Sequence, residues 1–263
     1  MGLHTGAPCA VRVLEAPAET GLWFRRIDGP DEPLPVMPSS VVATDRRTVL
    51  GRAGATISTV EHLLAALAGA GIWNAVVEVN GPEVPALDGS ALPFVVALRR
   101  LRRRPRPPAI RLRRAVQINR DGAAARAEPA AEASLRCHIH FDHPAIGSQC
   151  VGWQGTYRQF VRDVAPARTF GFVEEVVALR SKGLAQGGST GNALVYGREG
   201  PLTQPRMAME PAWHKLLDAM GDLALLGRPL HARVDLDNPG HHINVALVEE
   251  IWRQATAGVA VGP

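Results

Sequence analysis

The histidine and carboxylate side chains that could carry out metal-dependent chemistry are Glu61, His62, His214, Asp218 and Asp222. His214, Asp218 and Asp222 follow one another at four-residue intervals, which places them on one face of a helix. A histidine and a carboxylate one turn apart can bind Zn²⁺, and His62 would add a third ligand, with the fourth tetrahedral position left to water. Glu61, next to that third ligand, could then take a proton from the water.

Spacing alone leaves an ordinary structural explanation open. A histidine four residues before an aspartate is often only a surface pair. Here the neighbouring residues are mostly apolar, so the polar face would be buried and would need partners or a ligand. Three further histidines, His138, His140 and His143, lie in a strand-like segment. His138 and His140 would share one face of that strand, and we interpret them as structural side chains rather than ligands.

The candidate residues require two buried helices to hold them. The segment 59–71 has the composition of one such helix, with Thr59 as a candidate N-cap and Gly69 and Gly71 as stop signals. The segment 211–227 has the composition of the other. Other helices are predicted at 91–101, 156–164, 173–183 and 244–254, and strands at 11–16, 21–27, 75–80, 109–118, 123–129, 134–141, 193–197 and 230–236. Runs of strands with helices added, rather than strict alternation, predict an α+β fold with helices on one face of each sheet.

The composition excludes several classes of protein. The chain has 263 residues, of which 46% are hydrophobic and 21% charged, which argues against wholesale disorder. No stretch approaches the ~18 apolar residues that a membrane-spanning helix needs, and the N-terminus lacks the features of a secretory signal. An odd cysteine count, from Cys9, Cys137 and Cys150, excludes a complete disulfide framework. We therefore expect a cytoplasmic protein.

Positive charge is concentrated in one segment. The formal net charge is +4, and without nine arginines it would be −5; these are Arg99, Arg100, Arg102, Arg103, Arg104, Arg106, Arg111, Arg113 and Arg114. Such a segment can contact a nucleic acid or an anionic membrane surface. Prolines interrupt it and no aromatic residues are interleaved, which favours a solvated linker. We expect no nucleic-acid partner, and a peripheral membrane contact stays open as the alternative.

Several motifs together resemble a known family. They are GLHTG (2–6), the long block 59–94, FDHPAI (141–146), ARTFGF (167–172), HKLLDAMGDLALLG (214–227) and GHHIN (240–244). In this order they resemble the zinc-dependent UDP-3-O-acyl-N-acetylglucosamine deacetylases of lipid A biosynthesis. The resemblance runs from residue 2 to about residue 250, and the block 59–94 is its most specific part.

The resemblance implies a role for each matching residue. The metal ligands would be His62, His214 and Asp218. The catalytic groups would be Glu61 as general base, His241 as the catalytic histidine, Asp222 as the residue that orients it, and Thr169 at the oxyanion. The substrate contacts would be Lys215, His4 and Phe170.

The resemblance also implies a fold and a reaction. The fold would be two α+β domains, residues 1–104 and 105–263, with helices packed between two mainly antiparallel sheets. An insert at about 173–192 would form an apolar passage for an acyl chain. Val173, Val176 and Val177 would either line this passage or simply pack the insert against the rest of the protein. The reaction would be zinc-dependent hydrolysis of the N-acetyl group of the UDP-linked acylated sugar, releasing acetate, in the committed step of lipid A biosynthesis. We expect a monomer.

Three departures from the family pattern affect the interpretation. Family chains usually carry about fifteen residues before GLHTG that form a first strand, so we expect one sheet edge of the first domain to lack a partner. Trp213 stands where the family usually has an arginine, and His242 adds a second histidine beside His241. Two alternatives therefore stay open: a catalytically lapsed homologue that binds a nucleotide-sugar, and a deacetylase of another acylated sugar.

Overall fold

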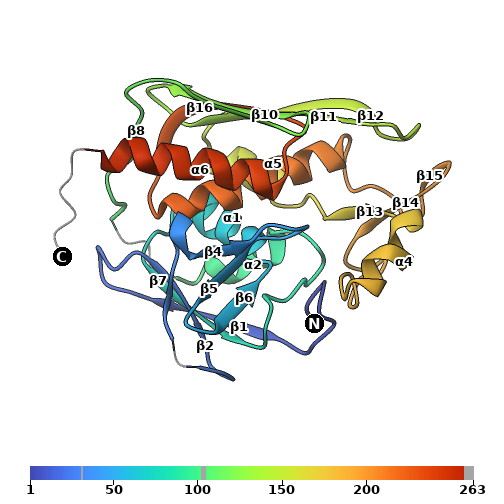
Figure 1. The fold of residues 1–263 in the computed structure, drawn as a ribbon, viewed down its shortest axis with the longest axis horizontal. Helices are drawn as coiled ribbons and strands as arrows, with labels where there is room; N and C mark the ends of the chain where they lie inside the picture. The colour runs from blue at the N-terminus through green and yellow to red at the C-terminus, as the bar shows by residue number, and fades with distance from the viewer. Residues whose placement is uncertain (31, 102–104, 258–263) are drawn as a thin grey trace.

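The computed structural model describes residues 1–30, 32–101 and 105–257. Two layers of strands enclose a layer of helices, which confirms the α+β class and the expectation of helices between two sheets (Figure 1). No helix in the described part of the chain has the length and apolar character needed to cross a membrane.

The larger sheet forms one outer layer. Its strands are, in spatial order, β12 (Gly147–Trp153), β11 (Ser134–Phe141), β16 (Leu230–Asp237), β10 (Ala123–Pro129) and β9 (Val116–Arg120). Neighbours are antiparallel except β11 and β16, which run parallel, as does the short strand β8 (Ile110–Arg111) beside β16. The single strand predicted at 109–118 is therefore two strands, β8 and β9, in different parts of the sheet.

The other outer layer contains the N-terminal strands. A four-stranded sheet has the order β1 (Ala10–Glu15), β7 (Ala75–Asn80), β2 (Leu22–Arg26) and β3 (Leu34–Pro35), and only β2 and β7 are parallel. A short 3-10 turn, η1 (Pro38–Ser40), leads into three antiparallel strands, β4 (Val41–Ala43), β5 (Val49–Arg52) and β6 (Ala55–Ser58). Both layers are thus mainly antiparallel, as expected.

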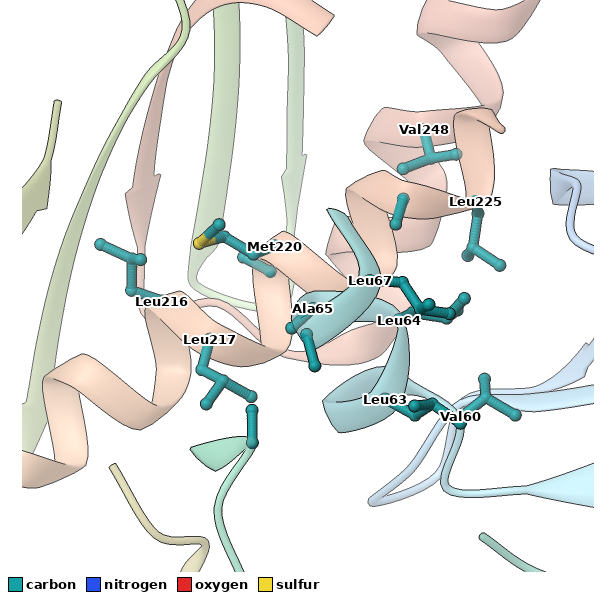
Figure 2. Close-up of a cluster of buried hydrophobic side chains, with 14 of the residues drawn as sticks. Val60, Leu63, Leu64, Ala65, Leu67, Leu216, Leu217, Met220, Leu225 and Val248 are labelled. Carbon is teal, nitrogen blue, oxygen red and sulfur yellow. The ribbon is translucent and has the colours of Figure 1, made fainter. Parts of the chain in front are cut away.

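The helices between the layers build the core. They are α1 (Glu61–Ala70), α2 (Leu92–Leu98), α5 (Glu210–Leu223) with the 3-10 turn η3 (Ala224–Leu226), and α6 (His241–Thr256). The leucines of α1 and α5 belong to one buried hydrophobic cluster, which Leu225 of η3 and Val248 of α6 join (Figure 2). Burial of each such side chain contributes about 1.5–3 kcal/mol, so this packing fixes how the two candidate ligand helices lie against each other.

Helix α1 begins differently from the prediction. Thr59 is not its N-cap: the residue has a φ of 57°, and its hydroxyl donates a 2.7 Å hydrogen bond to Glu83. The helix starts at Glu61 without a side-chain cap. Of the two predicted stops, Gly69 lies inside the helix, and the helix ends at Gly71, whose φ of 72° suits glycine.

Helices α1 and α5 approach each other closely at Gly221. A Cβ atom on Gly221 would lie 2.1 Å from the backbone oxygen of Glu61, which cannot move without moving α1. The glycine therefore permits the helix contact that brings the two groups of candidate residues together.

We expect Gly221→Ala to lower the free energy of unfolding by about 1–3 kcal/mol or more, since this is the usual cost of overpacking a well-filled core. Denaturant unfolding measures the change. Gly152→Ala is the matched control, because the nearest atom to its added Cβ would be 3.6 Å away, an ordinary contact. Equal stability of the two variants would contradict the close helix contact.

A projecting unit follows the core of the larger sheet. It contains β13 (Phe170–Phe172), α4 (Val173–Ser181), β14 (Leu194–Gly197) and β15 (Gly200–Pro201), and it extends to one side in Figure 1. Before it, the helix predicted at 156–164 is only one turn, α3 (Tyr157–Gln159), continued by the π-helical turn η2 (Phe160–Val164). The expected domain boundary at 104/105 adjoins residues 102–104, which lie outside the described residues, so the division into two domains stays a proposal.

Candidate metal centre

Three side chains converge where α1 and α5 cross. The candidate ligand atoms of His62, His214 and Asp218 all lie within 4.8 Å of one another, and each residue is at most 6% exposed. Asp218 Oδ1 is 3.6 Å from His62 Nε2 and 3.3 Å from His214 Nε2. This oxygen is buried and has no hydrogen-bond partner among the described residues. A buried carboxylate oxygen without a donor, facing two imidazole nitrogens, fits a divalent cation.

The surroundings hold these ligands in the form that binds a metal. His214 Nδ1 faces the backbone oxygen of Ala167 at 3.4 Å, which leaves Nε2 directed into the site. Burial lowers the pKa of His214 to about 4, so the imidazole is neutral. Burial opposes ionisation of Asp218, but the positive charges of Lys215 and His241 outweigh burial and hold the pKa of Asp218 well below its usual range. Metal ligands must be deprotonated in this way.

A second carboxylate and a third histidine flank the three ligands. Glu61 begins α1 and His241 begins α6, and both are buried. His241 Nε2 lies 3.9 Å from Glu61 Oε1 and 4.0 Å from Asp218 Oδ2. Burial raises the pKa of Glu61, which favours proton acceptance nearer neutral pH. The predicted base and the predicted acid therefore face the same space.

Asp222 lies behind His241. Its Oδ2 is 2.9 Å from His241 Nδ1. Burial alone would lower the pKa of His241, but the charge and hydrogen bond of Asp222 outweigh burial and raise that pKa to about 9. His241 is therefore positively charged near neutral pH, and its Nε2–H is free to donate.

Two partners of Asp222 were not predicted. Thr48 Oγ1 donates to Asp222 Oδ1 at 2.6 Å, and Asn244 Nδ2 donates to Asp222 Oδ2 at 2.9 Å. Asn244 could have been found, because it belongs to the GHHIN motif and follows His241 by one helical turn. Thr48 precedes a short strand and belongs to no motif, so the sequence carried no signal for it.

A cavity of about 390 Å³ opens onto these groups. The predicted site residues that line it are His4, Glu61, His62, Thr169, Phe170, His214, Lys215, Asp218 and His241. Lys215 Nζ is 3.2 Å from Asp218 Oδ2. Of the predicted set only Asp222 is not part of the wall, since it lies behind His241. His242 also lines the cavity, and its buried Nε2 has no partner among the described residues.

A second cavity of about 260 Å³ shares part of its wall with the first. Its apolar side is formed by Val176, Leu179, Ala193 and Val195 of the projecting unit. Of the three valines, only Val176 lines this cavity. Val173 and Val177 are 42% and 80% exposed and are not part of the lining, because they lie on the outer side of α4.

His4 is held in place by a buried carboxylate. Glu83 accepts hydrogen bonds from the backbone amides of His4 and Thr5 and from the hydroxyls of Thr5 and Thr59. Burial lowers the pKa of His4 to about 4, so its ring is neutral. The histidines on β11 have no such role: His138 pairs with Asp237 and His140 with Ser148, in agreement with a structural interpretation.

Thr169 is positioned by the residue before it. The amide and the guanidinium of Arg168 donate to Glu210, which is fully buried at the start of α5. Burial would raise the pKa of Glu210, but these donors and the amide of Arg206 outweigh burial and lower it. The pair therefore ties the Thr169 segment to the helix that carries two of the ligands.

This pair predicts a pH-dependent contribution to stability. Because the pKa of Glu210 is depressed in the folded state, its contribution is fully present above the unfolded pKa of about 4.3 and is lost as pH falls through the lower folded pKa. Glu210→Gln should cost about 3–5 kcal/mol at neutral pH, since Arg168 is left buried without its charge partner. Denaturant unfolding at several pH values should show a shallower acid loss for this variant than for the wild type.

The control is Glu174→Gln. Glu174 forms a 3.6 Å pair with Arg198 whose side chains are 48% and 89% exposed, and exposed pairs contribute no more than about 1 kcal/mol. Identical acid profiles of the wild type and Glu210→Gln would show that Glu210 does not supply the effect.

The sequence is similar to one family of enzymes along most of its length. The sequence model described as LpxC, UDP-3-O-acyl N-acetylglycosamine deacetylase, matches residues 1–253. A protein of Thermosynechococcus vestitus named UDP-3-O-acyl-N-acetylglucosamine deacetylase is 44% identical over 260 residues, which is 97% of this chain and 90% of that protein. Proteins with the same name from Phenylobacterium zucineum and Myxococcus xanthus are 42% and 39% identical. These alignments span 97% and 95% of this chain, and 92% and 82% of theirs.

Proposed function

The chain belongs to the UDP-3-O-acyl N-acetylglycosamine deacetylase family, and we propose that it hydrolyses the N-acetyl group of UDP-3-O-acyl-N-acetylglucosamine in lipid A biosynthesis. The observation that carries this proposal is the convergence of His62, His214 and Asp218 in the wall of a cavity that Glu61 and His241 also line. A metal-assisted amide hydrolysis needs these parts: an open metal site, a base and an acid.

The metal that fits this donor set is Zn²⁺. Two imidazole nitrogens and one carboxylate oxygen, with a cavity on the open side, are typical of catalytic rather than structural zinc. When bound, zinc would lower the pKa of a water molecule and polarise the amide carbonyl. Lys215, beside Asp218, would partly balance negative charge of the substrate.

The side chains of this chain would divide the proton transfers between them. Glu61 would accept a proton from the attacking water through its carboxylate, which faces the cavity. His241, kept charged by Asp222, would donate the Nε2 proton to the departing amine. The hydroxyl of Thr169 would donate to the oxyanion, a contribution of roughly 3 kcal/mol for one such donor.

The two adjoining cavities suit a substrate with a polar and an apolar part. His4, Phe170 and Lys215 line the first cavity and would contact the nucleotide-sugar, whereas the second is apolar on the side of α4. We propose that the second cavity holds the 3-O-acyl chain. Phe170 and Phe172 line both cavities and would lie along the path between them.

Leu179→Ala should raise KM for a long-chain substrate about 10-fold, because truncation removes two or more buried methylene-sized contacts at ~0.8 kcal/mol each. A short-chain analogue should show little change. Val177→Ala is the matched control on the same helix, since Val177 is 80% exposed. Steady-state kinetics on both substrates checks the prediction, and equal KM changes for the two variants would contradict the placement of the acyl chain.

One experiment separates the proposed function from its alternatives. Purified protein with its zinc content determined should release acetate from UDP-3-O-acyl-N-acetylglucosamine. A catalytically lapsed homologue would bind this compound without releasing acetate. A deacetylase of another acylated sugar would release acetate from that sugar and not from the UDP-linked one.

The cellular setting is part of the proposal. Cys9, Cys137 and Cys150 are free thiols, which suits a reducing compartment, and we propose a cytoplasmic monomer. Arg102, Arg103 and Arg104, at the centre of the basic segment, lie outside the described residues. The choice between a solvated linker and an anionic membrane contact therefore rests on vesicle binding by a variant with these three arginines changed to glutamine.

A further inference from the structure

Thr48 connects the two halves of the proton-transfer machinery. It lies immediately before β5 and is completely buried. Its hydroxyl donates to Asp222 Oδ1 at 2.6 Å, and its backbone amide donates to Glu61 Oε2 at 3.1 Å. One residue therefore bonds directly both to the general base and to the carboxylate that orients the acid.

The hydroxyl of Thr48 completes the bonding of Asp222. The other carboxylate oxygen, Oδ2, accepts from His241 Nδ1 and from Asn244 Nδ2, each at 2.9 Å. With Thr48 on Oδ1, both oxygens are occupied and the plane of the carboxylate is fixed. A hydroxyl has a single proton, and Thr48 donates it in the 2.6 Å hydrogen bond to Asp222 Oδ1. The lone pairs of Oγ1 therefore face His241 Nδ1, which is 3.2 Å away.

This arrangement determines which nitrogen of His241 enters the cavity. Asp222 and Thr48 both present acceptors to Nδ1, so this nitrogen carries a proton and stays directed away from the cavity. Nε2 is then directed toward Glu61 and Asp218. The amide of Thr48 fixes Glu61 from the same point of the backbone, so the separation of base and acid depends on where Thr48 sits.

We propose that Thr48 is a positioning residue for amide hydrolysis, which fixes the side chains of Glu61 and His241 relative to each other. The kinetic consequences of this inference rest on the proposed function. Its structural consequence rests on the hydrogen bonds alone. It assigns the effect to the hydroxyl group rather than to the space that the side chain fills.

Two substitutions separate the hydroxyl from the volume. Thr48→Val keeps the shape and removes the donor, which leaves Asp222 Oδ1 buried without a partner. Thr48→Ser keeps the donor and removes one methyl group. Both variants would be prepared with zinc, and zinc content and thermal unfolding would be measured on each before kinetics.

Thr48→Val should lower kcat about 10–100-fold, because small misplacements of reacting groups have effects of this size. KM and zinc content should stay at wild-type values, since Thr48 is neither a ligand nor part of the cavity wall. Thr48→Ser should recover kcat to within about threefold, because its hydroxyl can still donate to Asp222. A merely structural role would instead affect stability in both variants and would not separate kcat from KM.

A second readout does not depend on turnover. The proton on His241 Nδ1, hydrogen-bonded to a buried carboxylate, should give a far-downfield proton resonance, assigned by its loss in Asp222→Asn. The resonance should persist in Thr48→Ser and should shift or broaden in Thr48→Val. An unchanged resonance and kcat in Thr48→Val, or equal defects in the two variants, would overturn the inference. A wild type without deacetylase activity would refute the proposed function, while the resonance would still test Thr48.

Discussion

Asp218→Ala should yield a folded protein that holds almost no zinc and has lost more than about 10³-fold in turnover. The aspartate supplies the only carboxylate among the three ligands that the structure brings together, and its Oδ1 has no other partner among the described residues. Without it, two imidazoles remain, and the negative charge that offsets the cation is gone. Loss of the several kcal/mol that a metal supplies at a developing oxyanion corresponds to this drop in rate.

Asp222→Asn is the matched control for that experiment. Asp222 lies one helical turn beyond Asp218 on the same face of α5 and is equally buried, but it bonds His241 rather than the proposed metal ligands. This variant should keep its zinc and still lose turnover. Elemental analysis and acetate release together distinguish the two carboxylates. Full zinc occupancy in Asp218→Ala would refute its assignment as a ligand.

The strongly patterned elements could be predicted, and the short ones could not. Helices α1 and α5 carry long apolar faces with glycine stops, and both were predicted with small errors at their ends. Strands β3 to β6 have two to four residues each, too few to show alternation, and their pairing depends on turns rather than on hydrophobic pattern. The wrong cap at Thr59 has a specific cause: its hydroxyl bonds Glu83, 24 residues later in the chain.

The candidate site was predictable where local spacing carries the geometry. His214, Asp218 and Asp222 share a helical face, so their proximity follows from the helix alone. That His62 meets them depends on the crossing of α1 and α5 at Gly221, which no local pattern encodes. Residue type made His62 a candidate third ligand, and the resemblance to the family supported that choice. Thr48 shows the limit, since it belongs to no matched motif and its contacts to Glu61 and Asp222 are 13 and 174 residues away in the chain.

The adjacent histidines at the start of α6 should differ sharply in their effect on turnover. Consecutive helical residues point about 100° apart, since a turn takes 3.6 residues, and only His241 has contacts with Asp222, Glu61 and Asp218 within 4.0 Å. His242 lines the cavity without such contacts. His241→Ala should lower kcat about 10²–10⁴-fold, the usual range for loss of a general acid, with zinc retained.

His242→Ala should cost far less and should keep the decline of activity at high pH. That decline follows from the sign of the shift: the pKa of His241 is raised to about 9, so the acid form is present near neutral pH and is lost as the pH rises through that value. In His241→Ala the same decline should be absent from the residual activity. If His242→Ala loses activity while His241→Ala stays active, the general acid is assigned here to the wrong histidine, whatever the zinc content of the two variants.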